Sequence, residues 1–234
     1  MFERPHHQRI ASLLGCLDAM LLRDCGCLFG GGTAVALRFG EYRESLDVDF
    51  LVSDPEGYRR LRQLLAHGRS LAPIVRAGTP VPILDRDVRA DQYGIRTAVK
   101  VDGIAIKLEI VREARIELDS PSRTDEVCGV ATLTVLDLAA SKLLANSDRG
   151  LDDSTFARDV IDLAMIAPRL PLLRQAIGKA EQPYGDTIRR DLARSLDLLR
   201  DRQGWLDRCM LAMQMRTPRA LLWQRLRSLR RVLV

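Results

Sequence analysis

The sequence predicts an α+β protein, with a mixed α/β part over residues 1–118 and an α-helical part over residues 119–234. Residues 45–52 and 104–111 alternate apolar and polar side chains, a period of two that is typical of strands with one buried face. After Pro121 this alternation stops, and apolar residues recur at the spacing of amphipathic helices. We therefore expect a sheet with flanking helices first and a helical part second.

The N-terminal elements are predicted from helical spacing and from glycine. Apolar residues recur at helical spacing over residues 8–24, and Gly26 follows, so we expect one helix there. Residues 27–29 then form a short apolar strand, the glycines at 30–32 a turn, and residues 33–39 a second helix.

The segment 45–52 is predicted to be a strand whose two faces differ. Alternate residues form an apolar face with Leu46, Val48 and Phe50, and a polar face with Ser45, Asp47 and Asp49. Because the apolar face is expected to pack in the core, the other face presents the carboxylates.

A hairpin is predicted further along the mixed part. It follows a helix over 58–65 and a loop with a short strand over 73–82. Strands over 94–100 and 104–111 are joined through Asp102-Gly103, a dipeptide that favours a tight turn. The second strand is expected to turn four apolar side chains inward and two charged ones outward: Ile104, Ile106, Leu108 and Ile110, and Lys107 and Glu109.

The C-terminal part is predicted to be helical throughout. Two helices with apolar stripes cover about 136–144 and 156–167, and Pro168 ends the second. The remainder is helical as well, and its last helix carries a stripe of Leu222, Leu226, Leu229 and Leu233.

The composition excludes several classes of protein. With 47% hydrophobic and 29% charged residues, the chain is neither disordered nor fibrous. Its longest apolar runs are far shorter than the ~20 residues of a membrane span, and residues 1–7 lack the pattern of a secretory signal, so we expect a cytoplasmic protein. Its 5 cysteines have no paired spacing, which argues against a zinc site and a disulfide framework.

Basic residues are in excess, and most of them are arginine. Of 36 basic residues only Lys100, Lys107, Lys142 and Lys179 are lysines, and the net charge is +5. The arginine excess is explained equally by genomic base composition and by selection for phosphate binding. Residues 208–234 contain arginines but no Asp or Glu, and such a basic end favours an anionic partner.

The residues with the most chemical information are two carboxylates near the glycine turn. Asp47 and Asp49 are two apart in a strand, so their side chains point the same way from positions about 6–7 Å apart. Mg²⁺ prefers oxygen ligands and is often shared between carboxylates and the phosphates of a nucleotide. Glu109 on another strand can add a third carboxylate, as ligand or as base. The backbone N–H groups at the glycine turn form a cradle for phosphate oxygens.

This combination resembles the nucleotidyltransferase superfamily related to DNA polymerase β, in which a mixed sheet is flanked by helices. It is most similar to the AbiEii/AbiGii toxin family, which includes the MenT toxins. The first motif of that family resembles Gly30-Gly31-Gly32-Thr33 followed by Arg43-x-Ser45-x-Asp47-x-Asp49. Its helical motif resembles Lys142 with Arg149 and Arg158-Asp159 through Asp162, and the weaker third-carboxylate motif resembles residues 106–110.

The resemblance implies an enzyme that moves a nucleoside monophosphate from an NTP to an RNA acceptor, such as the 3′ end of tRNA. It implies Mg²⁺ or Mn²⁺ as cofactor, a toxic activity and a separately encoded antitoxin. The expected metal ligands are Asp47, Asp49 and Glu109. The expected nucleotide-binding residues are Gly31, Gly32, Thr33, Arg43, Ser45 and Lys142, and Asp159 joins Lys142 among the catalytic candidates. The helical part is then expected to contribute to the active site and to acceptor binding.

Each feature also has an ordinary structural interpretation. The glycines suit a plain turn, and the two aspartates suit a solvated strand face. Glu109 suits a pair with Lys107 on an exposed strand face. Lys142 suits a solvated charge, and Asp159 is placed to hold Lys142 or Arg149. Ser45 is either a control point, where a phosphate would repel the triphosphate, or a hydrogen-bond partner of Arg43 or the backbone. Two other functions remain open: transfer to a protein or small molecule, and a catalytically silent member that binds a partner.

Overall fold

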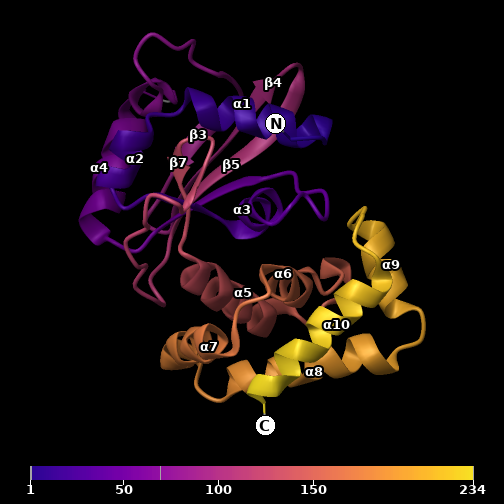
Figure 1. The fold of residues 1–234 in the computed structure, drawn as a ribbon. Helices are drawn as coiled ribbons and strands as arrows, with labels where there is room; N and C mark the ends of the chain where they lie inside the picture. Colours follow the sequence, from indigo (N-terminus) through magenta and orange to yellow (C-terminus); the bar gives the residue numbers. More distant parts are fainter. Residues whose placement is uncertain (1, 69, 234) are drawn as a thin grey trace. The chain divides into compact units, whose positions relative to one another are not determined.

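The computed structural model describes residues 2–68 and 70–233, and the chain divides into two compact units (Figure 1). The sheet unit comprises Met1–Arg38 and Ser45–Thr134, and the helical unit comprises Phe39–Glu44 and Val135–Val234. The α+β class, with a mixed sheet before a helical part, is confirmed. The sheet unit extends beyond residue 118, where the sequence places the boundary, because residues 119–134 cluster with it.

A five-stranded mixed sheet forms the framework of the sheet unit, in the order β1-β2-β5-β4-β3. The strands are β1 (Leu28–Gly30), β2 (Val48–Val52), β3 (Ile83–Ala90), β4 (Gly94–Val101) and β5 (Ile104–Arg112). β2 and β5 run parallel, and the other neighbouring pairs are antiparallel. A separate two-stranded ribbon is formed by β6 (Glu126–Val127) and β7 (Val130–Ala131).

One face of the central strands is buried, and the opposite face carries polar residues. The buried face is formed by Val48, Phe50, Val52, Ile95, Val99, Ile106, Leu108 and Ile110. Phe50 also packs against Phe29 of β1, with ring centroids 5.6 Å apart. Because side chains alternate along a strand, Asp49 of β2 and Glu109 of β5 lie on the opposite face.

Two helices replace the single helix that apolar spacing predicts over residues 8–24. They are α1 (Pro5–Cys16) and α2 (Ala19–Asp24). Between them Leu17 forms a β-bridge with Val75, and the Asp18 side chain accepts a 3.0 Å hydrogen bond from the Leu21 backbone N–H. This cap satisfies a donor that has no partner within the helix. A cap and a tertiary contact therefore end a helix that the apolar spacing continues.

The two remaining helices of the sheet unit are α3 (Gly31–Arg38) and α4 (Pro55–Gly68), and a 3₁₀ turn covers Ala72–Ile74. α3 begins at Gly31, so two of the three glycines form the first turn of the helix rather than a loop before it. α4 extends beyond the predicted range at both ends.

Some details of the predicted β structure are wrong. β3 and the β6–β7 ribbon are not predicted at all, and β3 is an edge strand with mostly exposed side chains. Leu46 and Ile104 are 53% and 44% exposed, although the alternation places them in the core. The reason is that β2 begins only at Val48, and Ile104 is the first residue of β5.

The helical unit is built around α5 (Val135–Arg149). Its other helices are α6 (Arg158–Ile166), α7 (Leu170–Tyr184), α8 (Thr187–Asp201), α9 (Trp205–Ala212) and α10 (Arg219–Leu229). α5 contacts α6, α7 and α8, and α10 packs on α6 through its apolar stripe (Figure 1). Over residues 2–68 and 70–233, no helix is long and apolar enough to cross a membrane.

Candidate active site

Two carboxylates become neighbours because β2 and β5 pair in parallel. The register places Asp49 beside Glu109, with Gly30 of β1 on the other side of Asp49. Arg96 of β4 is the register partner of Glu109, and Arg89 of β3 that of Arg96. Register partners point to the same face of a sheet, so a row of two acidic and two basic residues crosses the polar face.

The glycine turn and Asp49 are in close contact. Gly31 has φ +66°, a left-handed backbone conformation that glycine adopts without strain. A Cβ atom on Gly31 would lie 2.4 Å from Asp49 Oδ2. Only glycine therefore lets the first residue of α3 approach this carboxylate. The two parts of the first motif meet at one point in the sheet unit.

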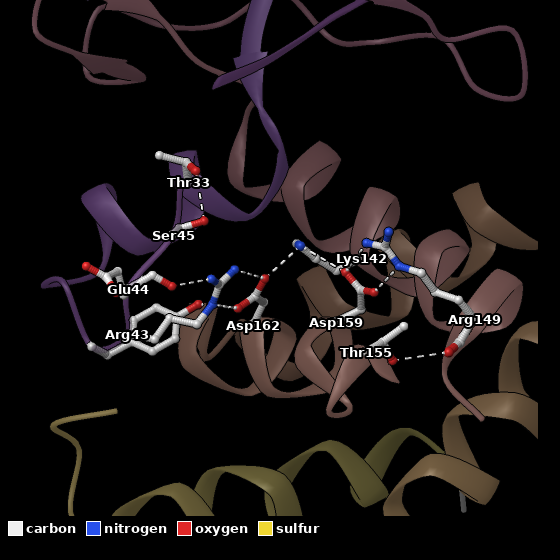
Figure 2. A network of polar contacts seen from close by, with 10 residues as sticks. Thr33, Arg43, Glu44, Ser45, Lys142, Arg149, Thr155, Asp159 and Asp162 are labelled. Carbon is white, nitrogen blue, oxygen red and sulfur yellow. Dashed lines mark hydrogen bonds and ion pairs between the residues drawn. The ribbon is translucent and has the colours of Figure 1, made fainter. Parts of the chain in front are cut away.

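Asp47 lies just before β2, and Thr33 fixes its backbone. The Thr33 hydroxyl donates a 2.5 Å hydrogen bond to the Asp47 carbonyl oxygen. It also lies 2.8 Å from Ser45 Oγ (Figure 2). Thr33 is buried in α3, whereas the Asp47 side chain is exposed. The Ser45 backbone N–H donates to His7 Nε2 at 3.1 Å. Thr33 thus holds the segment that leads into β2 and presents the Asp47 carboxylate to solvent.

Two cations occupy the surroundings of Glu109. Lys107 Nζ lies 2.7 Å from Glu109 Oε2, and Arg96 Nε lies 3.4 Å from Glu109 Oε1. The hydrogen bond to Glu109 raises the pKa of Lys107, and the charges of Asp47 and Asp49 act in the same direction. Lys107 therefore interacts electrostatically with all three acidic residues of this face: Asp47, Asp49 and Glu109.

The acidic residues supply oxygen ligands of the type that Mg²⁺ prefers. Asp49 and Glu109 are adjacent in register, and Asp47 forms no ion pair within the described part of the chain. No three His, Cys, Asp or Glu side chains among those residues already converge as a metal site. The donor set therefore fits a divalent ion in its chemistry, while Glu109 is turned to Lys107 and Arg96.

Two open hollows lie next to these carboxylates. Each has a volume of about 450 Å³, and they share Arg86 and Lys107 as lining residues. Asp47 lines one of them and Glu109 the other. The polar face of the sheet unit thus offers concave space on both sides of the shared basic residues.

A second polar cluster lies within the helical unit, where Lys142 of α5 meets two aspartates of α6. Lys142 Nζ lies 3.0 Å from Asp159 Oδ1 and 2.7 Å from Asp162 Oδ2 (Figure 2). Arg149 Nε lies 2.7 Å from Asp159 Oδ2. Lys142, Asp159 and Asp162 are at most 5% exposed. The interpretation of Lys142 as a solvated charge is therefore wrong, whereas the expected contact with Asp159 is confirmed.

Burial alone would raise the pKa of Asp159. The Lys142 ammonium and the Arg149 guanidinium outweigh that effect and hold the pKa well below its usual value. The pKa of Asp162 is lowered in the same way, because Arg43 and Lys142 outweigh its burial. Both carboxylates are therefore ionised at neutral pH, each with basic partners.

Arg43 belongs to the same cluster. Its Nε and Nη2 atoms donate to the two Asp162 carboxylate oxygens at 2.7 and 2.8 Å, and its Nη1 donates to the Glu44 carbonyl at 2.8 Å (Figure 2). The Tyr42 hydroxyl donates to Asp162 at 2.5 Å. A bidentate Arg–carboxylate pair of this kind is strong and fixes orientation. The contacts anchor the segment 39–44 in the helical unit.

The structure therefore sorts the predicted site residues into two groups. The sheet unit brings together Gly31, Gly32, Thr33, Ser45, Asp47, Asp49 and Glu109. The helical unit brings together Arg43, Lys142 and Asp159. The sequence reasoning missed His7, Arg96, Tyr42 and the hub position of Asp162. For Asp162 the sequence offered one signal: it is three residues from Asp159, so the two side chains lie on the same face of a helix.

The chain is similar to a known protein family and to two solved structures. The family model described as nucleotidyl transferase AbiEii toxin, type IV TA system, matches residues 16–226. JHP933 from Helicobacter pylori is 19% identical over 100% of this chain and 95% of its own, with a TM-score of 0.50. Another H. pylori protein, assigned as a nucleotidyltransferase, is 20% identical over 97% of this chain and 94% of its own, with a TM-score of 0.48. No curated protein matches the chain.

Proposed function

Because the chain belongs to the AbiEii family of nucleotidyltransferase toxins of type IV toxin–antitoxin systems, we propose that it transfers a nucleoside monophosphate from an NTP to an RNA acceptor. Membership makes it a nucleotidyltransferase with an antitoxin partner. The class of acceptor, the metal ion and the catalytic residues are proposals. We propose the 3′ end of tRNA as the first acceptor to test.

The observation that carries this proposal is the contact between the glycine turn and the carboxylate pair. Gly31 at the start of α3 lies against Asp49, and Asp49 is the register neighbour of Glu109. A helix start offers backbone N–H groups for phosphate oxygens, and the carboxylates offer ligands for a divalent cation. A helix start that is able to bind phosphate therefore lies next to carboxylates that are able to bind a cation. Nucleotidyl transfer from an NTP needs both.

In the proposed reaction, the 3′-hydroxyl oxygen of the acceptor bonds to the α-phosphorus. The bond from the α-phosphorus to the leaving oxygen breaks, and pyrophosphate departs with the electron pair. Asp47 and Asp49 would hold Mg²⁺ or Mn²⁺, and Glu109 would be a third ligand or would take the hydroxyl proton. When bound, that ion neutralises charge that develops on the phosphate oxygens.

The residues around the carboxylates support this chemistry in different ways. Gly31 and Gly32 offer backbone to the triphosphate at the start of α3. Thr33 is buried and bonded to the Asp47 carbonyl, so we propose that its side chain positions Asp47 and does not contact phosphate. The Ser45 hydroxyl lies 2.8 Å from that of Thr33, and we propose on the family resemblance that Ser45 lies near the nucleotide.

The helical unit is proposed to take part through its buried cluster. Lys142 and Asp159 remain candidates for the reaction on the family resemblance, as part of a domain that contributes to the active site and acceptor binding. For Arg43 we propose a positioning role, because Asp162 and the Glu44 carbonyl engage its Nε, Nη1 and Nη2 atoms.

The proposal is tested by asking which molecule receives the label. Purified protein is incubated with each α-³²P-labelled NTP and Mg²⁺ or Mn²⁺, together with total RNA, purified tRNA or RNA-free protein extract. We expect one NTP to label RNA, and nuclease digestion to place the label at the 3′ end. Label in protein or in a small molecule would instead establish the alternative acceptor, and the absence of any labelled product would favour a silent binding member.

A further inference from the structure

The basic C-terminal segment that the sequence singles out is largely engaged within the helical unit. Arg219 pairs with Asp207 at 2.7 Å, and Arg230 pairs with Asp197. Arg225 donates to the Met165 carbonyl oxygen at 3.2 Å. These arginines therefore have partners within the helical unit, which partly neutralise their charge.

The edge strand β3 differs, because it carries arginines without a carboxylate partner. Arg86 and Arg89 are exposed, and neither forms an ion pair with any residue in the described ranges 2–68 and 70–233. Arg96, the register partner of Arg89, is half-exposed and has weak contacts with Asp91 at 3.1 Å and Glu109 at 3.4 Å. Half-exposed ion pairs of this kind contribute little and are exchanged readily.

These three arginines line one hollow together with a carboxylate of the candidate active site. The hollow of about 450 Å³ that contains Glu109 is also lined by Arg86, Arg89 and Arg96. The register pairs Arg86 with Ala98 and Arg89 with Arg96, which are two residues apart on β4, and β3 is irregular between the two arginines. Since a strand rises about 3.3 Å per residue, Arg86 and Arg89 start from positions about 7 Å apart. Three arginines along one hollow offer a row of positions for the successive phosphates of an extended single strand.

An exposed aromatic residue lies at the end of the same strand pair. Tyr93 is 66% exposed in the turn between β3 and β4, immediately before Gly94. Its ring has no partner in the described part of the chain, while its backbone carbonyl accepts from the Arg112 N–H at 3.0 Å. The Tyr93 backbone N–H also donates to Asp91 Oδ1 at 2.7 Å, and Asp91 pairs with Arg96 at 3.1 Å. Proteins stack single-stranded bases on exposed aromatic rings that lie near basic side chains.

We propose that Arg86, Arg89 and Arg96, with Tyr93 at the hairpin turn, form the binding site for the single-stranded end of the acceptor RNA. The arginines hold backbone phosphates, and Tyr93 stacks on a base. The site leads the RNA end to the hollow that contains Glu109. This inference rests on the proposed function, since it assigns the surface that binds its acceptor.

The test measures the binding of a fluorescein-labelled single-stranded RNA by fluorescence anisotropy over a range of salt concentrations. Each phosphate contact to a single strand contributes about 0.7 to the slope of log affinity against log salt. Arg86→Gln/Arg89→Gln is expected to weaken binding and to lower that slope by about 1.4. Arg86→Lys/Arg89→Lys keeps the charges and is expected to keep most of the slope.

A second pair of variants separates stacking from charge. Tyr93→Ala is expected to weaken RNA binding about five-fold or more without changing the salt slope, and Tyr93→Phe to bind like the wild type. The matched control is Arg59→Gln/Arg60→Gln on α4, which removes the same charge from exposed arginines outside the hollow. It is expected to bind RNA with nearly the wild-type slope.

Transfer kinetics separate a failure of this inference from a failure of the proposed function. If the wild type labels RNA and Arg86→Gln/Arg89→Gln retains its RNA affinity and salt slope, the inference alone is wrong. A raised KM for the NTP with unchanged RNA binding would assign the arginines to the triphosphate instead, and would also overturn it. If the wild type transfers label only to other acceptors, the proposed acceptor and this site fail together.

Discussion

Replacement of Lys142 by methionine tests the buried cluster of the helical unit. The Lys142 side chain is 6% exposed and bridges two carboxylates that are themselves buried. Methionine keeps the aliphatic stem but removes the charge, so Asp159 is left with Arg149 and Asp162 with Arg43. The perturbation is therefore the loss of one cation from a cluster that retains two.

The expected cost follows from the burial of the cluster. Removal of one partner from a buried ion pair costs about 3–5 kcal/mol, because the remaining charge stays desolvated. Since each aspartate keeps one arginine, we expect the lower end, about 3 kcal/mol. A surface change would cost at most about 0.5 kcal/mol. For a chain of this size the expected loss lowers Tm by about 6–12 °C.

Urea denaturation followed by tryptophan fluorescence measures this cost, since Trp205 and Trp223 both lie in the helical unit. Lys142→Arg keeps the charge and should be less destabilised than Lys142→Met. Lys142→Met/Asp159→Asn should recover part of the lost stability, because it removes a carboxylate together with its partner. A Lys142→Met protein within about 0.5 kcal/mol of the wild type would refute the buried-cluster argument.

Three further predictions concern the glycine turn, pH and Ser45. Gly31→Ala should abolish transfer, because its Cβ would lie 2.4 Å from Asp49 Oδ2. The control Gly103→Ala, also at positive φ but with nothing within 4 Å of its Cβ, should retain transfer. Equal transfer rates of the two variants would contradict the role of Gly31. The free energy of unfolding should decrease as the pH falls below about 4, since the pKa of Asp159 is lower in the folded than in the unfolded state. Asp159→Asn should flatten this pH dependence when urea unfolding is measured at a series of acidic pH values. The same pH dependence in Asp159→Asn and wild type would contradict the contribution of Asp159. Ser45→Glu should lose transfer through repulsion of the triphosphate while remaining folded by circular dichroism, and full activity would exclude electrostatic control there.

The sequence predicts those parts of the fold that depend on local pattern. Alternation located β2 and β5 and placed Asp49 and Glu109 on polar faces, and the Asp102-Gly103 turn indicated the hairpin that joins β4 to β5. It did not show that β2 and β5 are parallel neighbours, because the register of distant strands depends on tertiary packing. β3 was missed for a related reason: an exposed edge strand with charged side chains has no apolar alternation.

The buried cluster of the helical unit was likewise not predictable from local sequence patterns. A lysine among polar residues of a helix has the pattern of a solvated charge. Its burial follows from α6, which supplies two aspartates, and from the segment 39–44, which supplies Arg43. Three segments far apart in the sequence meet there, and no spacing within one of them predicts the meeting.

We propose that the carboxylates beside the glycine turn support nucleotidyl transfer to RNA. The most direct measurement compares wild type, Asp49→Asn and the surface control Arg59→Gln/Arg60→Gln for pyrophosphate release and ³²P incorporation into RNA. Asparagine keeps the shape of Asp49 but removes the charge that would hold Mg²⁺. We predict that wild type and control release pyrophosphate in step with RNA labelling, and that Asp49→Asn does neither while keeping its Tm. Labelling of RNA by Asp49→Asn at the wild-type rate would contradict a role of this carboxylate in transfer.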